Sequence, residues 1–226
     1  MTRELLRVEG LSKSFQSGGN RVPVLSDLAL TLAAGESLAL MGRSGSGKST
    51  LLNLLCGLEA PDSGRIMVAG QTVDTGAEAG RGAAERLWSG LRRQKIGVVF
   101  QDANLMPALS LLDNVRLRAS LAGQPDRDCG LWLERLGIGH LGQRYPDQVS
   151  GGQRQRAAMA MVFAMAPELI LADEPTGSLD RRTADEVSDV LFRLQSDTGC
   201  GLVLATHDPE LAKRCDRCLD LAHGTP

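Results

Sequence analysis

The residues from 42 to 50 carry the clearest chemical pattern in the chain. They fit Gly-x-x-x-x-Gly-Lys-Ser/Thr and are Gly42, Arg43, Ser44, Gly45, Ser46, Gly47, Lys48, Ser49 and Thr50. An apolar run, 37–41, precedes them, and a leucine-rich run with helical character follows. Glycines let backbone N–H groups point at phosphate oxygens, and the start of a helix adds its positive dipole end. The pattern therefore predicts a phosphate-binding loop in which Lys48 reaches the β- and γ-phosphates of a nucleotide and Ser49 ligates Mg²⁺.

The alternative is a glycine-rich turn that meets the pattern by accident. Ordinary residue frequencies give such a match in about one chain of this length in a hundred. Because a strand is expected before the loop and a helix after it, an accidental match is rarer still. The context therefore favours nucleotide binding.

A second candidate is the acidic pair Asp173 and Glu174, which directly follows the apolar run Leu169–Ala172. In a parallel sheet, ligands bind at the carboxyl ends of the strands, so we expect this pair beside the phosphate loop. There Asp173 can hold Mg²⁺, and Glu174 can orient or deprotonate the water that attacks the γ-phosphate. Acidic pairs after strands also cap helices, and the upstream phosphate loop is what favours the catalytic interpretation.

A second glycine-rich entry into a helix comprises Ser150, Gly151, Gly152 and Gln153. Taken alone, it is better interpreted as a plain helix start capped by Ser150. Its amides and helix dipole also suit an anion. Since only one of the two glycine-rich segments carries a lysine, the pair points to a split nucleotide site.

A largely parallel sheet is needed to hold these motifs. Strands are expected at 5–15, 22–32, 37–41, 65–68, 96–100, 169–172, 202–205 and 217–221, with helices after the phosphate loop, at 84–94, at 182–195 and from 209. Pro23 suggests that the second strand begins at a sheet edge. The small, polar residues 74–83 predict a mobile surface loop.

Residues 101–165 contain no pattern typical of a strand, and sequences typical of helices occupy 111–121, 129–136 and 152–165. We therefore expect a single α/β domain over 1–226 with the fold of a P-loop NTPase. Its nucleotide-binding core comprises 1–100 and 166–226, with an antiparallel β subdomain, and 101–165 forms an inserted helical lobe.

Charge and hydropathy exclude several classes of function. The chain has 25 Lys plus Arg against 27 Asp plus Glu, a net charge of −2, and 3% aromatic residues, which provides neither a basic footprint nor a stacking platform for nucleic acid. The longest apolar run, 157–166, is short of the about 20 residues that a membrane span requires, and no signal peptide is evident. We expect a cytoplasmic protein with no direct membrane insertion and no nucleic-acid partner.

The five cysteines are scattered along the chain, which indicates free thiols in a reducing compartment. Cys215 and Cys218 have metal-ligand spacing, but no second pair or histidine lies near them in sequence. A structural role is therefore favoured for both.

Taken together, these motifs resemble the nucleotide-binding subunits of ATP-binding cassette (ABC) transporters over nearly the whole chain. Ser150–Gln153 match the family's signature motif, with Val149 where leucine is usual. Gln101 matches the glutamine that senses Mg²⁺ and the membrane partner, and Ser178–Asp180 match the loop that crosses to the second subunit. His207 matches the switch histidine.

The resemblance also gives a role to Phe15, which would otherwise be interpreted as a core residue. It lies where the family stacks an aromatic ring on adenine. The implied cofactors are ATP and Mg²⁺, with Ser49, Gln101 and Asp173 around the metal ion. The resemblance implies an ATPase whose catalytic residues are Glu174, His207, Lys48 and Gln101.

A finer resemblance is to the lipoprotein-releasing and macrolide-exporter ATPases. The segments similar to that group are 97–101, 104–107, 113–115 and 172–177, although Ser178 stands where many members have asparagine. It implies a head-to-tail homodimer that closes on ATP and drives an integral membrane permease, on the inner face of the cell membrane. The work done would be export, lipid or lipoprotein extraction, or mechanotransmission.

Three alternatives remain. One is the ATPase of an amino-acid-type importer, and another is a soluble ABC ATPase of DNA repair, translation or iron–sulphur assembly. The coiled-coil inserts and paired cassettes of the repair and translation proteins are absent from this sequence. The third is a regulator without turnover, against which the intact Glu174 and His207 argue.

Overall fold

The computed structural model describes residues 3–74 and 81–221, and its centre is a five-stranded parallel sheet. The strand order is β6-β7-β8-β3-β9, and every neighbouring pair is parallel. The strands are β3 (Ser37–Met41), β6 (Ile96–Val99), β7 (Leu169–Asp173), β8 (Gly201–Ala205) and β9 (Arg217–Asp220). The predicted parallel sheet is confirmed.

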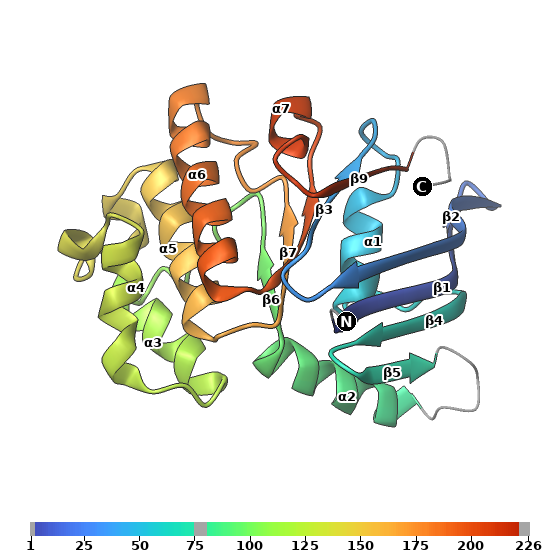
Figure 1. Ribbon diagram of the computed structural model, residues 1–226, viewed down its shortest axis with the longest axis horizontal. Coiled ribbons are helices and arrows are strands. Elements are labelled where there is room, and N and C mark those ends of the chain that lie inside the picture. The colour runs from blue at the N-terminus through green and yellow to red at the C-terminus, as the bar shows by residue number, and fades with distance from the viewer. Residues whose placement is uncertain (1–2, 75–80, 222–226) are drawn as a thin grey trace.

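A second, antiparallel sheet packs beside the first, on the right in Figure 1. Its order is β2-β1-β4-β5, with β1 (Glu4–Ser17), β2 (Asn20–Ala33), β4 (Ser63–Val68) and β5 (Gln71–Asp74). Pro23 lies on the edge strand β2, as predicted. Strand β5 was not predicted, because Val73 is the one apolar residue in its four.

Seven α-helices occur in the described residues: α1 (Lys48–Leu55), α2 (Arg81–Gln94), α3 (Leu111–Leu121), α4 (Cys129–Arg135), α5 (Gly151–Ala164), α6 (Arg181–Thr198) and α7 (Pro209–Ala212). Short 3₁₀ turns at Asp126–Asp128, Gly139–Leu141 and Pro146–Gln148 link α3 to α5. The loop predicted over 74–83 is wrong at both ends, since β5 includes Asp74 and α2 begins at Arg81. The rest of that loop lies outside the described residues.

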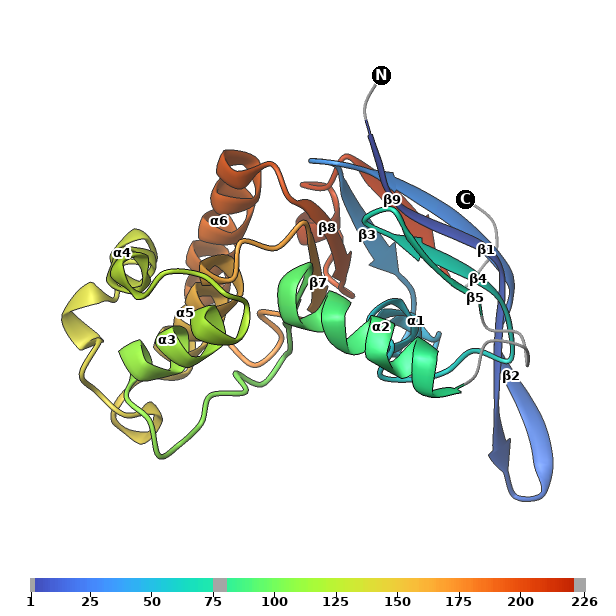
Figure 2. The same ribbon diagram turned by 90° about the horizontal axis from the view of Figure 1, so that it is seen from below.

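The parallel sheet is buried on both faces, and its central strands contribute to two separate cores. On β7, Leu169 and Leu171 pack with α1 and the antiparallel sheet. Ile170 and Ala172 point the other way and pack with α3 to α6. Figure 2 shows the sheet between these two layers. Since side chains alternate along a strand, an unbroken apolar run is what a doubly covered strand requires.

The helix that follows the phosphate loop is held at its far end by α2. Trp88 packs on Gly57, where an added Cβ would lie 2.2 Å from the indole ring. Arg92 donates hydrogen bonds to the carbonyl oxygens of Cys56 and Gly57, at 3.1 and 2.9 Å. A cation at the C-terminal end of a helix is favourable, so α1 is anchored at the end opposite its ligand-facing start.

None of the helices in the described part of the chain combines the length and the apolar character that crossing a bilayer requires.

Candidate nucleotide-binding site

The phosphate loop connects β3 to α1 with a backbone conformation that requires glycine. Gly45 and Gly47 have φ angles of 83° and 97°, in the left-handed region. A Cβ on Gly47 would also lie 2.9 Å from Val24 Cγ1, so this position has no room for a side chain. Gly47 is the N-cap of α1, and the free N–H groups of that helix therefore start directly after the turn.

Lys48 is the first residue of α1, and its side chain turns back over the loop. It is 8% exposed, and Nζ donates to the carbonyl oxygens of Gly42 at 2.8 Å and Arg43 at 3.3 Å. Ser46 Oγ is buried and has no hydrogen-bond partner. An ammonium, an unpaired hydroxyl and a helix start together form a site for an anion.

An open cavity of about 720 Å³ lies above the loop, a volume typical of small-molecule sites. It brings together most of the predicted residues: Phe15, Ser44, Gly45, Gly47, Lys48, Ser49, Thr50, Gln101, Asp173, Glu174 and His207. Val24 also lines it and was not predicted. Gly42, Arg43 and Ser46 belong to the loop but do not line the cavity, and neither do Ser150, Gly151, Gly152 or Gln153.

The two carboxylates at the end of β7 have different environments. Asp173 Oδ1 is buried without a hydrogen-bond partner, and unpaired buried carboxylate oxygens are unfavourable unless a cation joins them. Glu174 has a φ of 44°, which is uncommon for a residue with a Cβ. Its N–H donates to Ala205 O at 3.0 Å, so the bent backbone is fixed by the neighbouring strand β8.

His207 contacts the second carboxylate directly. Its Nδ1 lies 2.9 Å from both carboxylate oxygens of Glu174. The imidazole is largely exposed, whereas the Glu174 side chain is 18% exposed. With its proton on Nδ1, the histidine donates to the carboxylate and orients it toward the cavity.

Gln101 follows β6 and contacts the loop after β7. Ser178 Oγ donates to Gln101 O at 3.4 Å. A Cβ on Gly177 would lie 3.2 Å from the Gln101 amide nitrogen, so the two segments are in close contact. Gln155 on α5 is buried and donates to Phe100 O at 2.8 Å, which links the same segment to the glycine-rich helix.

The start of α5 is a complete capping box. Ser150 Oγ accepts from Gln153 N at 3.3 Å, and Gln153 Oε1 accepts from Ser150 N at 2.9 Å. A Cβ on Gly152 would lie 2.3 Å from Thr183 Cγ2 on α6, whereas one on Gly151 would have an ordinary 3.5 Å contact with Leu179. The helix start thus packs on the segment that begins α6, and it does not line the cavity of its own chain.

Lys13 is a further residue beside the cavity, and it was not predicted from the sequence. This residue lies on β1, is 8% exposed and places Nζ 5.0 Å from the centre of the Phe15 ring. Leu11, Lys13 and Phe15 occupy every second position of the strand, so their side chains lie on the same face. A lysine in an inward-facing row of apolar residues was the signal that could have identified it.

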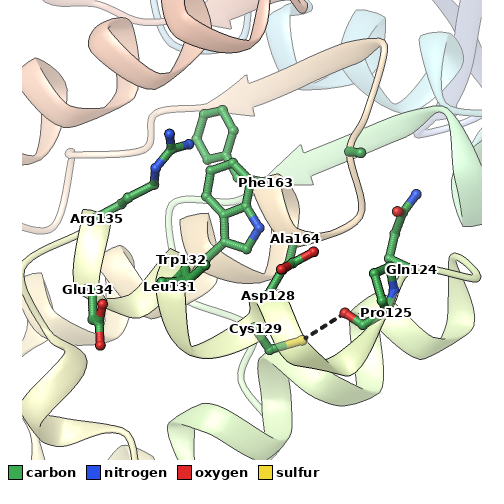
Figure 3. A pocket seen from close by; sticks show the side chains of 11 residues that line it. Gln124, Pro125, Asp128, Cys129, Leu131, Trp132, Glu134, Arg135, Phe163 and Ala164 are labelled. Carbon is green, nitrogen blue, oxygen red and sulfur yellow. Dashed lines mark hydrogen bonds between the residues drawn. The ribbon is translucent and has the colours of Figure 1, made fainter.

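A second cavity, of about 360 Å³, lies in the helical region and is shown in Figure 3. Trp132 of α4 stacks on Phe163 of α5 with ring centres 5.7 Å apart, and Arg135 covers the indole at 5.0 Å. Cys129 Sγ contacts Pro125 O at the same place. None of the predicted site residues lines this cavity.

All five cysteines are free thiols. Burial, and then the charge of Asp216, raise the pKa of Cys215 to about 12, so this thiol stays protonated at physiological pH. The described part of the chain holds no cluster of three or more histidine, cysteine or acidic side chains arranged around a common point. A structural role for Cys215 and Cys218 stays a prediction.

Comparison with known proteins places this chain in one family. The family model described as ABC transporter matches residues 25–177. The chain is 41% identical to the uncharacterized ABC transporter ATP-binding protein YbbA of Escherichia coli K12, covering 97% of this chain and 95% of the relative. It is 43% identical to the lipoprotein-releasing system ATP-binding protein LolD of Bordetella avium, covering 97% and 94%. A solved structure of the ATP-binding cassette MJ0796, described as a dimer in a post-hydrolysis state bound to ADP and Pi, superposes with a TM-score of 0.84 at 31% identity, covering 97% and 95%.

Proposed function

Because this chain belongs to the ABC transporter family and is its ATP-hydrolysing subunit, we propose that two copies enclose ATP between them and drive a membrane permease of the lipoprotein-releasing type. One observation carries the proposal. The cavity gathers the phosphate loop, the carboxylates and His207, but it lacks Ser150–Gln153 of the same chain. A second copy is needed to bring that helix start to the nucleotide.

The proposed arrangement is a head-to-tail homodimer. In a two-fold assembly the phosphate loop of each copy faces the α5 helix start of the other, so that two equivalent sites form. Gly152 is buried against Thr183, but Gly151 is only half-buried and carries no side chain that could cover the N–H groups at this helix start, so the γ-phosphate can accept hydrogen bonds there. The dimeric state described for the MJ0796 cassette supports the association of two copies.

The residues of the cavity fit Mg²⁺. Asp173 Oδ1 is a buried carboxylate oxygen without a partner, and oxygen ligands are those that Mg²⁺ prefers. We propose that Asp173, Ser49 and Gln101 hold the ion. When bound, it neutralises charge on the phosphates during hydrolysis.

Glu174 is proposed as the general base. It accepts the proton of the attacking water, while His207 holds the carboxylate by its Nδ1–H. The α5 helix start of the second copy and Lys48 stabilise the charge that develops on the γ-phosphate during the transfer. Phe15, a residue that lines the cavity and is 40% exposed, is proposed to stack on the adenine.

The permease type rests on the relatives. LolD proteins of Bordetella avium and Shewanella oneidensis, at 43% and 39% identity, are named as ATP-binding proteins of lipoprotein-releasing systems. Purification of the tagged chain in detergent from its own cells, followed by mass spectrometry, tests this assignment. A co-purifying permease of another transporter class would contradict it.

Light scattering tests the shared site. Glu174→Gln removes the base but keeps nucleotide binding, so ATP with Mg²⁺ should shift this variant from monomer to dimer, and ADP should not. Adding Gly151→Asp places a carboxylate beside the partner's γ-phosphate, and like charges should prevent closure.

Gly151 suits this test because a Cβ there makes only an ordinary contact with Leu179, so the double variant should fold. A double variant that dimerises as readily as Glu174→Gln alone would contradict the shared site. If Glu174→Gln stays monomeric in isolation, the comparison is repeated on the detergent-purified complex, where failure to trap ATP would be decisive.

A further inference from the structure

Lys13 is a buried lysine that lies beside Phe15, one of the residues that line the nucleotide cavity. Its Nζ donates to Glu59 Oε1 at 2.5 Å and to Ala60 O at 2.6 Å. Burying an ammonium is unfavourable unless it is paired and hydrogen-bonded, so these two acceptors determine where the side chain lies. The ammonium group of Lys13 is therefore held in one position beside β1.

That place is over the ring of Phe15. The two residues are separated by one position on β1, so their side chains share a face of the strand. Nζ lies 5.0 Å from the ring centre, within the range of a cation–π contact. Phe15 lines the cavity and is 40% exposed, so the ammonium covers one side of the ring while another side stays accessible.

The acceptors of Lys13 belong to the segment that follows α1. The N–H groups of Leu58 and Glu59 both donate to Asn53 O on that helix, at 2.9 and 3.2 Å. Asp62, in the same segment, donates from its N–H to Ser12 O at 2.9 Å, and its Oδ2 accepts from Ser14 N at 2.9 Å.

Strand β1 is thus fixed at Ser12, Lys13 and Ser14 to the segment that follows α1, and that segment is hydrogen-bonded to Asn53 of the helix. The start of α1 is the phosphate loop. Lys13 therefore lies on the direct physical connection between the aromatic ring and the residues that bind phosphate.

We propose that Lys13 is a positioning residue for the nucleotide base: it fixes the Phe15 ring over its own ammonium and sets the ring's distance from the phosphate loop. This inference rests on the proposed function, in which Phe15 stacks on adenine. The positive charge on one face also withdraws electron density from the ring, which strengthens stacking of an electron-rich purine on the other face.

Calorimetric titration with two ligands tests the proposal. ADP carries the base and is not hydrolysed, whereas pyrophosphate lacks the base but binds the same loop. For Lys13→Met, which preserves the length of the side chain, we expect the ADP dissociation constant to rise about three- to tenfold and the pyrophosphate constant to stay unchanged. Lys13→Arg keeps a cation over the ring and should retain the wild-type ADP affinity.

A double-mutant cycle with Phe15→Ala supplies the decisive comparison. If Lys13 acts through the ring, Lys13→Met should weaken ADP binding no further once Phe15 is alanine. Equal losses for ADP and pyrophosphate, an unchanged ADP affinity in Lys13→Met, or an undiminished loss in the Phe15→Ala background would each overturn the proposal.

The controls separate this inference from the function on which it rests. If Phe15→Ala binds ADP as the wild type does, the stacking role itself fails, and the role of Lys13 fails with it. If Phe15→Ala weakens ADP binding and Lys13→Met does not, only the role of Lys13 fails. Should Lys13→Met not fold, Glu59→Gln loosens the same ammonium and should weaken ADP binding but not pyrophosphate binding; equal losses there would also count against the proposal.

Discussion

Lys48 shows how much of the chemistry resides in a single side chain. Its ammonium contacts loop carbonyls of Gly42 and Arg43 rather than the hydrophobic core. We expect Lys48→Ala to lower the ATPase rate at least about a hundredfold, because one preorganised donor to a developing charge is worth about 10²–10³ in kcat. The melting temperature should change little. A phosphate-release assay and thermal unfolding measure the two quantities.

Lys95→Ala is the matched control for this variant. Lys95 is at the opposite end of the sheet, where it pairs with Glu168 on the surface. Its loss should leave the ATPase rate unchanged. Wild-type turnover in Lys48→Ala would contradict the assignment of the loop.

At the residue scale, the sequence predicted which residues gather around one cavity better than it predicted their geometry. The phosphate loop, Asp173, Glu174 and His207 could be found because each lies at or just after the end of a strand, and parallel strands end at one edge of the sheet. The positive φ of Glu174 was not predictable, since a local motif does not reveal that Ala205 on another strand fixes the bend. Lys13 was missed for a similar reason, because its acceptors lie far along the chain.

At the scale of elements, the long helices and buried strands were predictable and the marginal ones were not. α3 begins at Leu111 and ends at Leu121, the predicted bounds, because Ser110 caps it and apolar residues recur along it. β5 gave no signal, since it pairs along one side only and buries only Val73 among the side chains described. Its existence depends on pairing with β4, which is a tertiary contact.

The packing of α5 on α6 leads to a prediction about two adjacent glycines. A Cβ on Gly152 would collide with Thr183 Cγ2 at 2.3 Å, and the branched threonine side chain has little freedom to move. We expect Gly152→Ala to lower the free energy of unfolding by about 1–3 kcal/mol. Urea denaturation followed by circular dichroism measures the change.

Gly151→Ala is the matched control, because the added methyl group there meets Leu179 at an ordinary distance of 3.5 Å. It should leave the stability unchanged or slightly higher. Thr183→Ser removes the colliding methyl group and should restore most of the loss in a Gly152→Ala background. A loss of the same size in both single variants would mean that helix geometry, rather than contact with Thr183, is responsible.

At the scale of the whole molecule, one buried side chain, that of Asn114, holds the backbone of the segment after Gln101 in place while Met106 in that segment stays exposed. Asn114 is fully buried; its Oδ1 accepts from Met106 N at 2.7 Å, and its Nδ2 donates to Met106 O at 3.2 Å. Met106 itself is 51% exposed. An exposed methionine on a rigidly held loop beside Gln101 suits contact with a partner protein.

We predict that this segment contacts the permease. Met106→Arg should leave the basal ATPase rate of the isolated chain unchanged and abolish stimulation in the reconstituted complex. Leu58→Arg is the control, since Leu58 is 56% exposed but lies in the loop after α1. Leu105 is less suitable for this test because it packs against the core. Stimulation that survives Met106→Arg would exclude Met106 as a docking residue.

The two-sided burial of β7 has a consequence for how the molecule melts. Its alternate side chains belong to different cores, so neither core can open without exposing one face of this strand. Local opening is favoured where few apolar contacts are lost, and both faces of β7 would lose many apolar contacts on opening. Asp173 and Glu174 are thus attached to the part of the chain that opens last, and amide protons on β7 should exchange only by global unfolding. The position of these carboxylates is therefore as durable as the fold itself.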